Sequence, residues 1–275
     1  MYKRQELITD APSLPEPTTP RLGDGSGNVE LLNVTFGYGD KPVLVDVTFH
    51  ARPGTVTAIV GPSGSGKTTI ARLISRFWDV DSGAVMVDGV DIRELGTEQL
   101  MSRLSMVFQD VYLFDDSLIA NIRVGRPDAS DEEVFRAADL SGVTSIANRL
   151  GWHTPVGEGG RLLSGGERQR VSVARALLKQ APIVLFDEAT SALDAENEAN
   201  ILAAMDELRE QSTFIVIAHK LDTIKSADQI VVLDEHGQVS QLGTHSELSD
   251  VPGIYRHFWQ QRKAASGWKI SSGRD

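Results

Sequence analysis

Residues 61–68, GPSGSGKT, have the composition and spacing of a loop that holds phosphate groups. In the pattern G-x-x-x-x-G-K-[ST], glycines let consecutive backbone N–H groups turn inward around a polyphosphate, where a Cβ would intrude. The helix expected next, TTIARLISRF, presents its positive N-terminus to the same anion. Lys67 would reach the β- and γ-phosphates of a nucleotide, and the Thr68 hydroxyl would bind Mg²⁺. We predict that the nucleotide is held by Gly61, Pro62, Ser63, Gly64, Ser65, Gly66, Lys67, Thr68 and Thr69.

The alternative interpretation of this stretch is an ordinary Gly/Ser turn before a helix. The preceding residues, TVTAIV at 55–60, have the apolar character of a buried strand. Strand, loop and helix therefore follow one another in the order that phosphate binding requires, which favours the nucleotide site.

Two carboxylates, Asp187 and Glu188, follow the apolar run IVLF at 183–186. Open α/β sheets place their ligands at the carboxyl ends of the strands. Asp187 is suited to orienting Mg²⁺ through water, and Glu188 to polarising an attacking water. The alternative is that both carboxylates merely begin a loop. The phosphate-binding loop upstream favours the catalytic interpretation.

The composition limits the class of protein. The chain has 275 residues, 41% hydrophobic and 24% charged, which is enough for one large domain or two small ones. A net charge of −11 opposes a nucleic-acid partner, because neutralising phosphates needs a basic face. There is no cysteine, the apolar runs are short, and the N-terminus lacks the apolar core of a signal peptide. These features predict a soluble, acidic, cytoplasmic chain.

Apolar strands alternate with helices along most of the chain, which predicts an α/β fold with a mainly parallel sheet covered on both faces. Strands are expected at 29–36, 43–51, 55–60, 83–89, 104–109, 181–188, 212–219 and in a hairpin over 229–243. The first two predict an antiparallel layer. Helices are expected within 117–150, at 164–180 and 195–211, and after a capping box at Thr244 and Glu247. The helical block interrupts the alternation and predicts an inserted subdomain at about 110–180.

The ends of the chain differ in composition from the rest. Residues 1–28 contain Pro12, Pro15, Pro17 and Pro20 followed by GDGSGN, which predicts a linker. A folded domain is expected over 29–262, and a polar tail over 263–275.

A second helix mouth with glycines begins at Ser164, in LLSGGERQR. On its own this segment is equally a good helix N-cap. The phosphate loop, LLSGGERQR and IVLFDEATSALD, in this order, together resemble the ATP-binding-cassette (ABC) ATPase family, over about residues 29–262. The resemblance implies a P-loop NTPase core that binds ATP and Mg²⁺. It also implies that Ser164, Gly165 and Gly166 close over ATP held by a second cassette.

The same resemblance implies further roles. Tyr38 would stack on adenine, the alternative being a turn tyrosine. Gln109 would sense Mg²⁺ and contact the membrane domain, and Asp194, in the segment SALD, would belong to a loop that connects the two nucleotide sites. His219 would hold the γ-phosphate and the attacking water.

The chain departs from the commonest family pattern at two positions. In the segment LLSGGERQR, Glu167 occupies a position where a neutral glutamine is usual in the family. It adds a negative charge near a bound triphosphate. Lys220 follows His219 where arginine is commoner. Glu188 is intact, so the resemblance implies a hydrolysing site.

The segment TPVGEGG at 154–160 resembles exporter-type cassettes, in which Glu158 would contact coupling helices of a transmembrane domain. The arginine usual after this glutamate is replaced by Gly159. Such cassettes normally follow six membrane helices, so we expect part of a half-transporter at the cytoplasmic face of the membrane. The substrate is open between siderophore, lipid and drug. Two alternatives are a soluble ABC ATPase without transport and a nucleotide-gated interaction module. The acidic charge and the intact Glu188 and His219 disfavour them.

Overall fold

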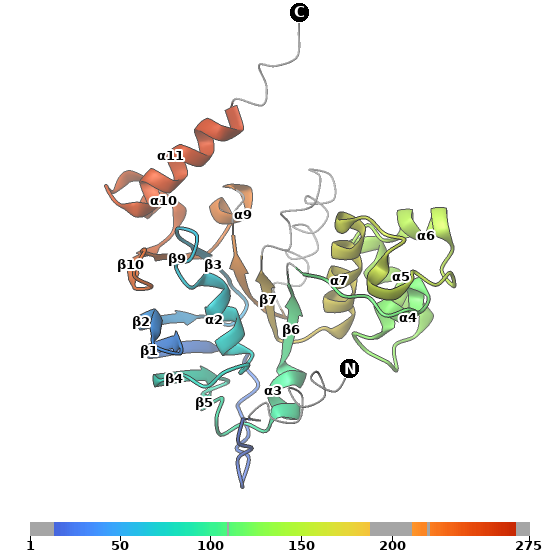
Figure 1. The fold of residues 1–275 in the computed structure, drawn as a ribbon, viewed down its shortest axis with the longest axis horizontal. Coiled ribbons are helices and arrows are strands. Elements are labelled where there is room, and N and C mark those ends of the chain that lie inside the picture. Colours follow the sequence, from blue (N-terminus) through green and yellow to red (C-terminus); the bar gives the residue numbers. More distant parts are fainter. Residues whose placement is uncertain (1–13, 109, 188–210, 219–220, 268–275) are drawn as a thin grey trace, which may run out of the picture.

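The computed structural model describes residues 14–108, 110–187, 211–218 and 221–267, and its strands form two sheets (Figure 1). The larger sheet has six strands, in the spatial order β10 (Val239–Gly243), β9 (Gln229–Leu233), β3 (Val56–Val60), β8 (Thr213–Ile217), β7 (Ile183–Asp187) and β6 (Leu104–Val107). All neighbouring pairs are parallel except β9 and β10, which form the expected hairpin. Every residue of β3, β7 and β8 is buried, as in parallel strands with both faces covered.

The smaller sheet is antiparallel and lies beside the larger one (Figure 1). Its spatial order is β2 (Lys41–Ala51), β1 (Val29–Tyr38), β4 (Ser82–Val87) and β5 (Val90–Asp91). The predicted N-terminal antiparallel layer is confirmed, and β4 and β5 join the first two strands in it.

Alternate residues of the parallel strands enter two different cores. In β3, Ile59 packs in the core shared with the antiparallel sheet, while Ala58 and Val60 pack in the core beneath the helical lobe. The same alternation separates Leu185 from Phe186 in β7. Successive side chains of a strand point to opposite faces, so one short strand belongs to both cores.

The helices divide between the sheets and a separate lobe. Those outside the lobe are α2 (Lys67–Ile74), α3 (Thr97–Arg103), α9 (Leu221–Lys225), α10 (His245–Asp250) and α11 (Ile254–Gly267). The lobe contains α4 (Leu118–Arg123), α5 (Asp131–Leu140), α6 (Thr144–Leu150), the 3-10 turn η1 (Glu158–Gly160) and α7 (Gly165–Lys179). It lies on the right in Figure 1, with α7 packed against α4 and α5. The predicted helical block is confirmed. The helix expected at 195–211 falls outside the described residues except at Gln211.

The C-terminal end contains two helices in place of the single one expected. The capping box of Thr244 and Glu247 starts α10, as predicted. The chain then turns at 251–253, where Pro252 cannot continue a helix, and α11 runs past the boundary expected at 262. In the described ranges, none of the helices combines the length and the apolar character needed to cross a membrane.

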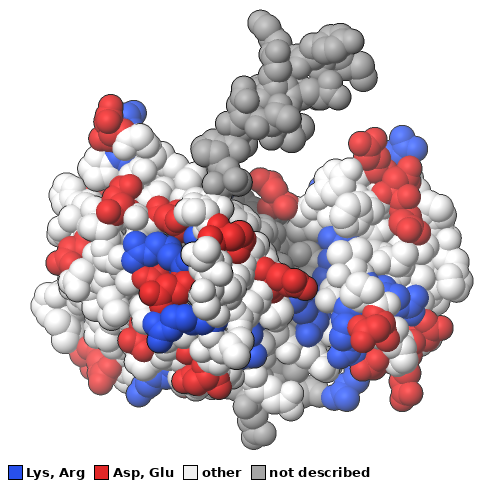
Figure 2. Space-filling view, turned by 90° about the horizontal axis from the view of Figure 1, so that it is seen from below, with Lys and Arg blue, Asp and Glu red and all other residues white. Residues whose placement is uncertain are grey.

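Charged side chains of both signs are distributed over the surface. On the face shown in Figure 2, basic and acidic groups lie intermingled, with no single basic field across it. This distribution agrees with the net charge of −11.

The segment expected to be a linker is described from residue 14 onward, and it is hydrogen-bonded along the surface of the folded domain. Asp88, which is 4% exposed, accepts hydrogen bonds from the backbone N–H of Gly27 (2.6 Å) and from Arg103 Nε (2.7 Å). Nearer the start of the segment, Glu16 accepts a hydrogen bond from the Thr97 N–H at 3.2 Å. These contacts fix the segment to the β4–β5 turn and to the start of α3.

The Asp88–Arg103 ion pair yields a stability prediction. We expect Asp88→Asn to lower the free energy of unfolding by about 3 kcal/mol, because it leaves a half-buried guanidinium without its counter-charge. Asparagine tolerates the left-handed backbone of this residue, whose φ is 51°, so the variant isolates the charge. The measurement is urea unfolding.

The matched control is Glu94→Gln, which breaks the exposed Arg21–Glu94 pair (2.7 Å). That change should cost less than about 1 kcal/mol, as exposed pairs do. Equal losses in the two variants would contradict the role assigned to Asp88.

Candidate functional site

The loop 61–66 connects the end of β3 to the start of α2. Gly66 is the N-cap of α2, with φ of 91°, and no side chain caps the helix. The first turn of α2 carries no acidic residue. The backbone N–H groups at this helix mouth are therefore left for an anion, with the positive end of the helix dipole behind them.

Lys67 and Ser65 add two polar side chains to the loop. Lys67 is 7% exposed, and its Nζ donates to the carbonyl oxygens of Gly61 (3.1 Å) and Pro62 (2.7 Å). Ser65 is 2% exposed, and among the described residues its Oγ has no hydrogen-bond partner. A buried hydroxyl without a partner costs stability unless a ligand satisfies it. The loop thus has the donors that a polyphosphate needs.

Thr68 and Asp187 meet at the carboxyl end of the parallel sheet. The Thr68 hydroxyl donates to Asp187 Oδ1 at 3.2 Å, and Asp187 is 5% exposed at the end of β7. Two predicted metal-binding side chains, far apart in the sequence, are therefore brought together. Over the described ranges no group of three or more histidine or acidic side chains is placed to hold a metal ion.

A pocket of about 380 Å³ extends from the loop toward Tyr38. Its lining residues are Tyr38, Val43, Ser63, Gly64, Gly66, Lys67, Thr68 and Thr69. The Tyr38 hydroxyl lies 3.5 Å from Thr69 Oγ1, and the tyrosine is 40% exposed. An aromatic ring and the N-terminus of a helix in the lining of one pocket suit a ligand with a flat ring and a polyphosphate.

Strand β2 contributes Val43 to the lining of this pocket. Glycines on both sides of the strand let it lie close to the phosphate loop and to the β9–β10 turn. A Cβ on Gly66 would lie 2.5 Å from Leu44 Cδ2, and a Cβ on Gly237, in the β9–β10 turn, would lie 1.9 Å from the Val43 carbonyl oxygen. The Val45 N–H in turn donates to the Gly237 carbonyl at 3.1 Å. Residues 43–45 are therefore held between the phosphate loop and the β9–β10 hairpin.

The N-terminus of α7, the second glycine-rich helix start, is capped by its own side chains. Ser164 and Glu167 form a capping box at the start of α7, with Ser164 N–H donating to Glu167 Oε2 (2.8 Å) and Glu167 N–H donating to Ser164 Oγ (3.2 Å). Arg149 Nη2 donates to the other carboxylate oxygen at 2.5 Å. Burial opposes ionisation here, yet the Ser164 N–H and Arg149 hold the pKa of Glu167 below its usual range. The extra negative charge expected at Glu167 is therefore balanced by Arg149.

Ser164, Gly165 and Gly166 do not line the pocket around the phosphate loop. Helix α2 begins without a side-chain cap at the described pocket, whereas α7 begins with a capping box and its first residues do not line that pocket. The α7 mouth belongs to the helical lobe (Figure 1).

Two exposed aromatic side chains, Tyr112 and Phe114, lie near the turn that contains Glu158. They are 57% and 53% exposed, and their rings meet at 5.8 Å. Arg175 holds this segment by donating to the Tyr112 carbonyl (2.9 Å), and its guanidinium lies 5.8 Å from the centre of the Phe114 ring. The sequence analysis did not single out these aromatics, which lie exposed beside a polar turn.

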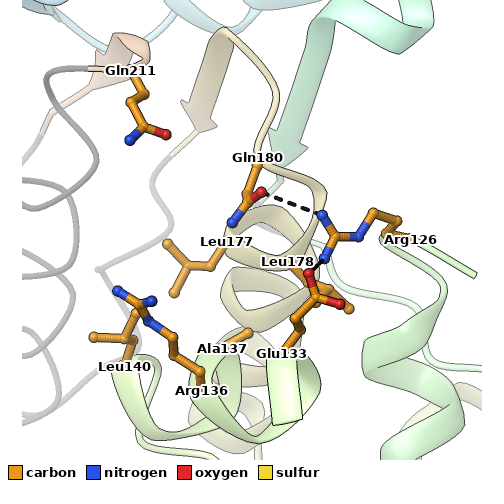
Figure 3. A pocket seen from close by; sticks show the side chains of 9 residues that line it. All are labelled: Arg126, Glu133, Arg136, Ala137, Leu140, Leu177, Leu178, Gln180 and Gln211. Atoms are coloured by element: carbon orange, nitrogen blue, oxygen red, sulfur yellow. Dashed lines mark hydrogen bonds and ion pairs between the residues drawn. The ribbon is translucent and has the colours of Figure 1, made fainter. Parts of the chain in front are cut away.

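A different hollow lies in the helical lobe, between α5 and α7 (Figure 3). Arg126 lies at one side of it, bound to Gln180 at 3.3 Å and to Glu133. Leu140 and Leu177 line its apolar part. None of its lining residues belongs to the phosphate loop, so we assign it no part in nucleotide binding.

Several predicted site residues lie outside the described residues, so the geometry of the site is built without them. They are Gln109, Glu188, Asp194 and His219. Two residues that the sequence analysis did not weigh, Val43 and Arg149, contact the described site. Both act across large sequence separations, and no local pattern marks them.

Comparison with known proteins agrees with this geometry. Residues 44–191 match the ABC transporter family. The chain is 47% identical, over 274 residues, to the mycobactin import ATP-binding/permease protein IrtB of Mycolicibacterium thermoresistibile, covering 98% of this chain and 47% of the relative. It is 47% identical over 234 residues to an ATP-dependent lipid A-core flippase of Vibrio vulnificus, covering 84% and 40%.

The fold also matches a solved structure, that of a bacterial Atm1-family ABC exporter with ATP bound. The TM-score is 0.89 at 42% identity, over 95% of this chain and 46% of the exporter chain. The chain spans about half the length of the curated relatives it matches. From the sequence motifs, the fold and these matches together, the chain belongs to the ABC transporter family, in which it corresponds to the ATP-binding region.

Proposed function

We propose that this chain binds and hydrolyses ATP to power transport by an exporter-type ABC transporter. The observation that carries the proposal is the contact between Thr68 and Asp187. It joins the phosphate loop to the end of β7 and places a hydroxyl and a carboxylate at one point. That arrangement is the one a nucleotide hydrolase needs beneath a triphosphate.

The residues of the loop fit a triphosphate, and Tyr38 fits a base. The uncapped mouth of α2, the buried Ser65 hydroxyl and Lys67 all offer donors to phosphate oxygens. We assign ATP to this pocket, with contacts from residues 61–69 and stacking of adenine on Tyr38.

Thr68 and Asp187 also fit Mg²⁺, which proteins hold through one or two side chains together with phosphate oxygens and water. We propose that Thr68 binds the ion directly, that Asp187 orients it through water, and that Gln109 senses it. When bound, the ion would neutralise charge on the β- and γ-phosphates.

Catalysis is assigned to Glu188 and His219. Asp187 ends β7 at the edge of the sheet where open α/β folds place their ligands, and Glu188 is the next residue in the sequence. We propose that Glu188 polarises the attacking water and that His219 holds that water and the γ-phosphate.

A second cassette completes the site in this proposal. The described pocket is lined by residues between Tyr38 and Thr69, and the helix mouth at Ser164–Gly166 is not part of it. Two cassettes paired head to tail would let each such mouth close over ATP held by its partner, and two-fold symmetry would make the composite sites identical. Asp194 would belong to the connection between them.

The remaining partner is a transmembrane domain. The exposed Tyr112 and Phe114, beside the turn that begins at Glu158, support docking of its coupling helices on this surface. The cassette would then lie at the cytoplasmic face of the membrane. The intermingled charges of Figure 2 and the net charge of −11 support the absence of a nucleic-acid partner.

The first substrate class to test is a siderophore, because two relatives are named for mycobactin import. A lipid is the alternative, since lipid A-core flippases are as similar to the chain.

Glu188→Gln should abolish ATP turnover while preserving ATP binding. A general base contributes about 10²- to 10⁴-fold in rate, and glutamine cannot accept the proton. Phosphate release and ATP affinity are measured on the same preparation. Lys67→Ala is the contrasting variant and should weaken binding itself. Turnover at the wild-type rate in Glu188→Gln would remove this residue from the mechanism.

The paired arrangement predicts ATP-dependent dimers. In the Glu188→Gln background, ATP should shift the chain from monomer to dimer in light scattering, because the composite site is not emptied by hydrolysis. Ser164→Ala combined with Gly165→Asp should block the shift, since it removes a hydroxyl and adds a negative charge at the α7 mouth.

The matched control is Ser130→Ala, which removes the equivalent capping box at the start of α5 in the same lobe. It should cost about 1 kcal/mol of stability and leave dimerisation intact. If the Ser164/Gly165 double variant still dimerises with ATP, the head-to-tail arrangement is wrong.

A further inference from the structure

Two aromatic side chains hold the ring of Tyr38 from different parts of the chain. Phe36, two residues before it in β1, meets it at 5.1 Å with an interplanar angle of 86°. Trp78, which follows α2, meets it at 5.3 Å with an angle of 87°. Near-perpendicular contacts at these distances are a favoured geometry of aromatic pairs. The orientation of the Tyr38 ring is therefore set by its neighbours before any ligand arrives.

The segment that carries Trp78 is anchored at both ends. On one side Arg76, 7% exposed, binds Asp79 at 3.0 Å and donates to the Pro15 carbonyl at 2.8 Å. On the other side Asp81 accepts a hydrogen bond from the Gly37 N–H at 2.9 Å.

Asp81 also ties its own backbone to the same strand. Its N–H donates to the Thr35 carbonyl at 3.0 Å. The indole is thus fixed to β1, next to the residue whose ring it touches.

Trp78 does not itself line the nucleotide pocket, whereas Tyr38 does. The tyrosine has one further polar neighbour, Thr69, at 3.5 Å from its hydroxyl. Any effect of the indole on a ligand in this pocket therefore passes through the tyrosine ring.

We propose that Trp78 is a positioning residue for adenine, which fixes the plane of the Tyr38 ring on which the base stacks. The proposal rests on the proposed function, in which Tyr38 binds the base. With the indole in place, the ring is ordered before binding, so less conformational entropy is lost when the base stacks. Without it, Phe36 is the one aromatic neighbour that the 40% exposed tyrosine retains among the residues that the structure describes.

The test is equilibrium binding by calorimetry, with EDTA present so that no turnover occurs. Two probes are titrated into the same protein, ATP and inorganic tripolyphosphate. Trp78→Ala should weaken ATP binding about two- to tenfold, the factor that corresponds to one aromatic pair. Its affinity for tripolyphosphate should be unchanged, because the phosphate loop is untouched. Trp78→Phe keeps an aromatic edge and should bind ATP within about twofold of the wild type.

The matched control is Trp152→Ala in the helical lobe. It deletes an indole that pairs with Phe135 at 4.7 Å, far along the chain from the pocket, and should leave both affinities unchanged. In a Tyr38→Ala background, adding Trp78→Ala should produce no further loss of ATP affinity, because the two side chains act as one unit.

Three outcomes would overturn the role of Trp78 alone: unchanged ATP affinity in Trp78→Ala, an equal loss for both probes, or an undiminished loss in the Tyr38→Ala background. Failure of the underlying adenine site has a different signature. In that case the wild type and Tyr38→Ala bind ATP equally well, whatever Trp78 does.

Discussion

The close approach of β2 to the mouth of α2 is the constraint on which the rest of the nucleotide site depends. The strand passes so near Gly66 that a Cβ there would overlap Leu44, and so near Gly237 that a Cβ would overlap the Val43 carbonyl. Only glycine combines this proximity with positive φ. Because of these two contacts, the antiparallel sheet, the phosphate loop and the β9–β10 hairpin have one fixed relative position, and Tyr38 stands at a defined distance from the loop.

A second set of contacts connects Tyr38, in the pocket, to Phe108 through a row of aromatic side chains. From Tyr38 the aromatic contacts continue through Trp78 to Phe77 (6.4 Å) and on to Phe108 (6.0 Å), the residue before Gln109. Arg76, the residue before Phe77, donates a hydrogen bond to the Pro15 carbonyl oxygen in the N-terminal segment. Tyr38, Phe108 and the segment at Pro15 are therefore joined by contacts between neighbouring side chains.

Much of the fold and part of the site follow from local patterns in the sequence. The phosphate loop, the buried strand before it, the helix start at Ser164 and the capping box at Thr244 are all encoded within a few residues, and the structure has them where they were predicted. The site features that the sequence did not predict depend on contacts between distant residues.

Arg149, in α6, neutralises Glu167, in α7, through a contact between two helices. The segment LLSGGERQR alone therefore indicated a negative charge without a partner. Trp78 reaches Tyr38 because α2 returns the chain to β1, and Val43 closes the pocket because β2 passes beneath the loop. No periodicity or spacing records such pairs. The single C-terminal helix expected from the capping box is likewise two helices in the structure, because the turn at Pro252 separates α10 from α11.

The alternation of residues in β3 connects the strand that precedes the phosphate loop to two different layers of the protein. Ile59 packs among side chains of the antiparallel layer, and its neighbours Ala58 and Val60 pack beneath the helical lobe. Protein interiors are close-packed and transmit strain rather than absorb it. A displacement of the helical lobe and a displacement of the antiparallel layer are therefore both transmitted to this short strand, through adjacent residues just before the phosphate loop.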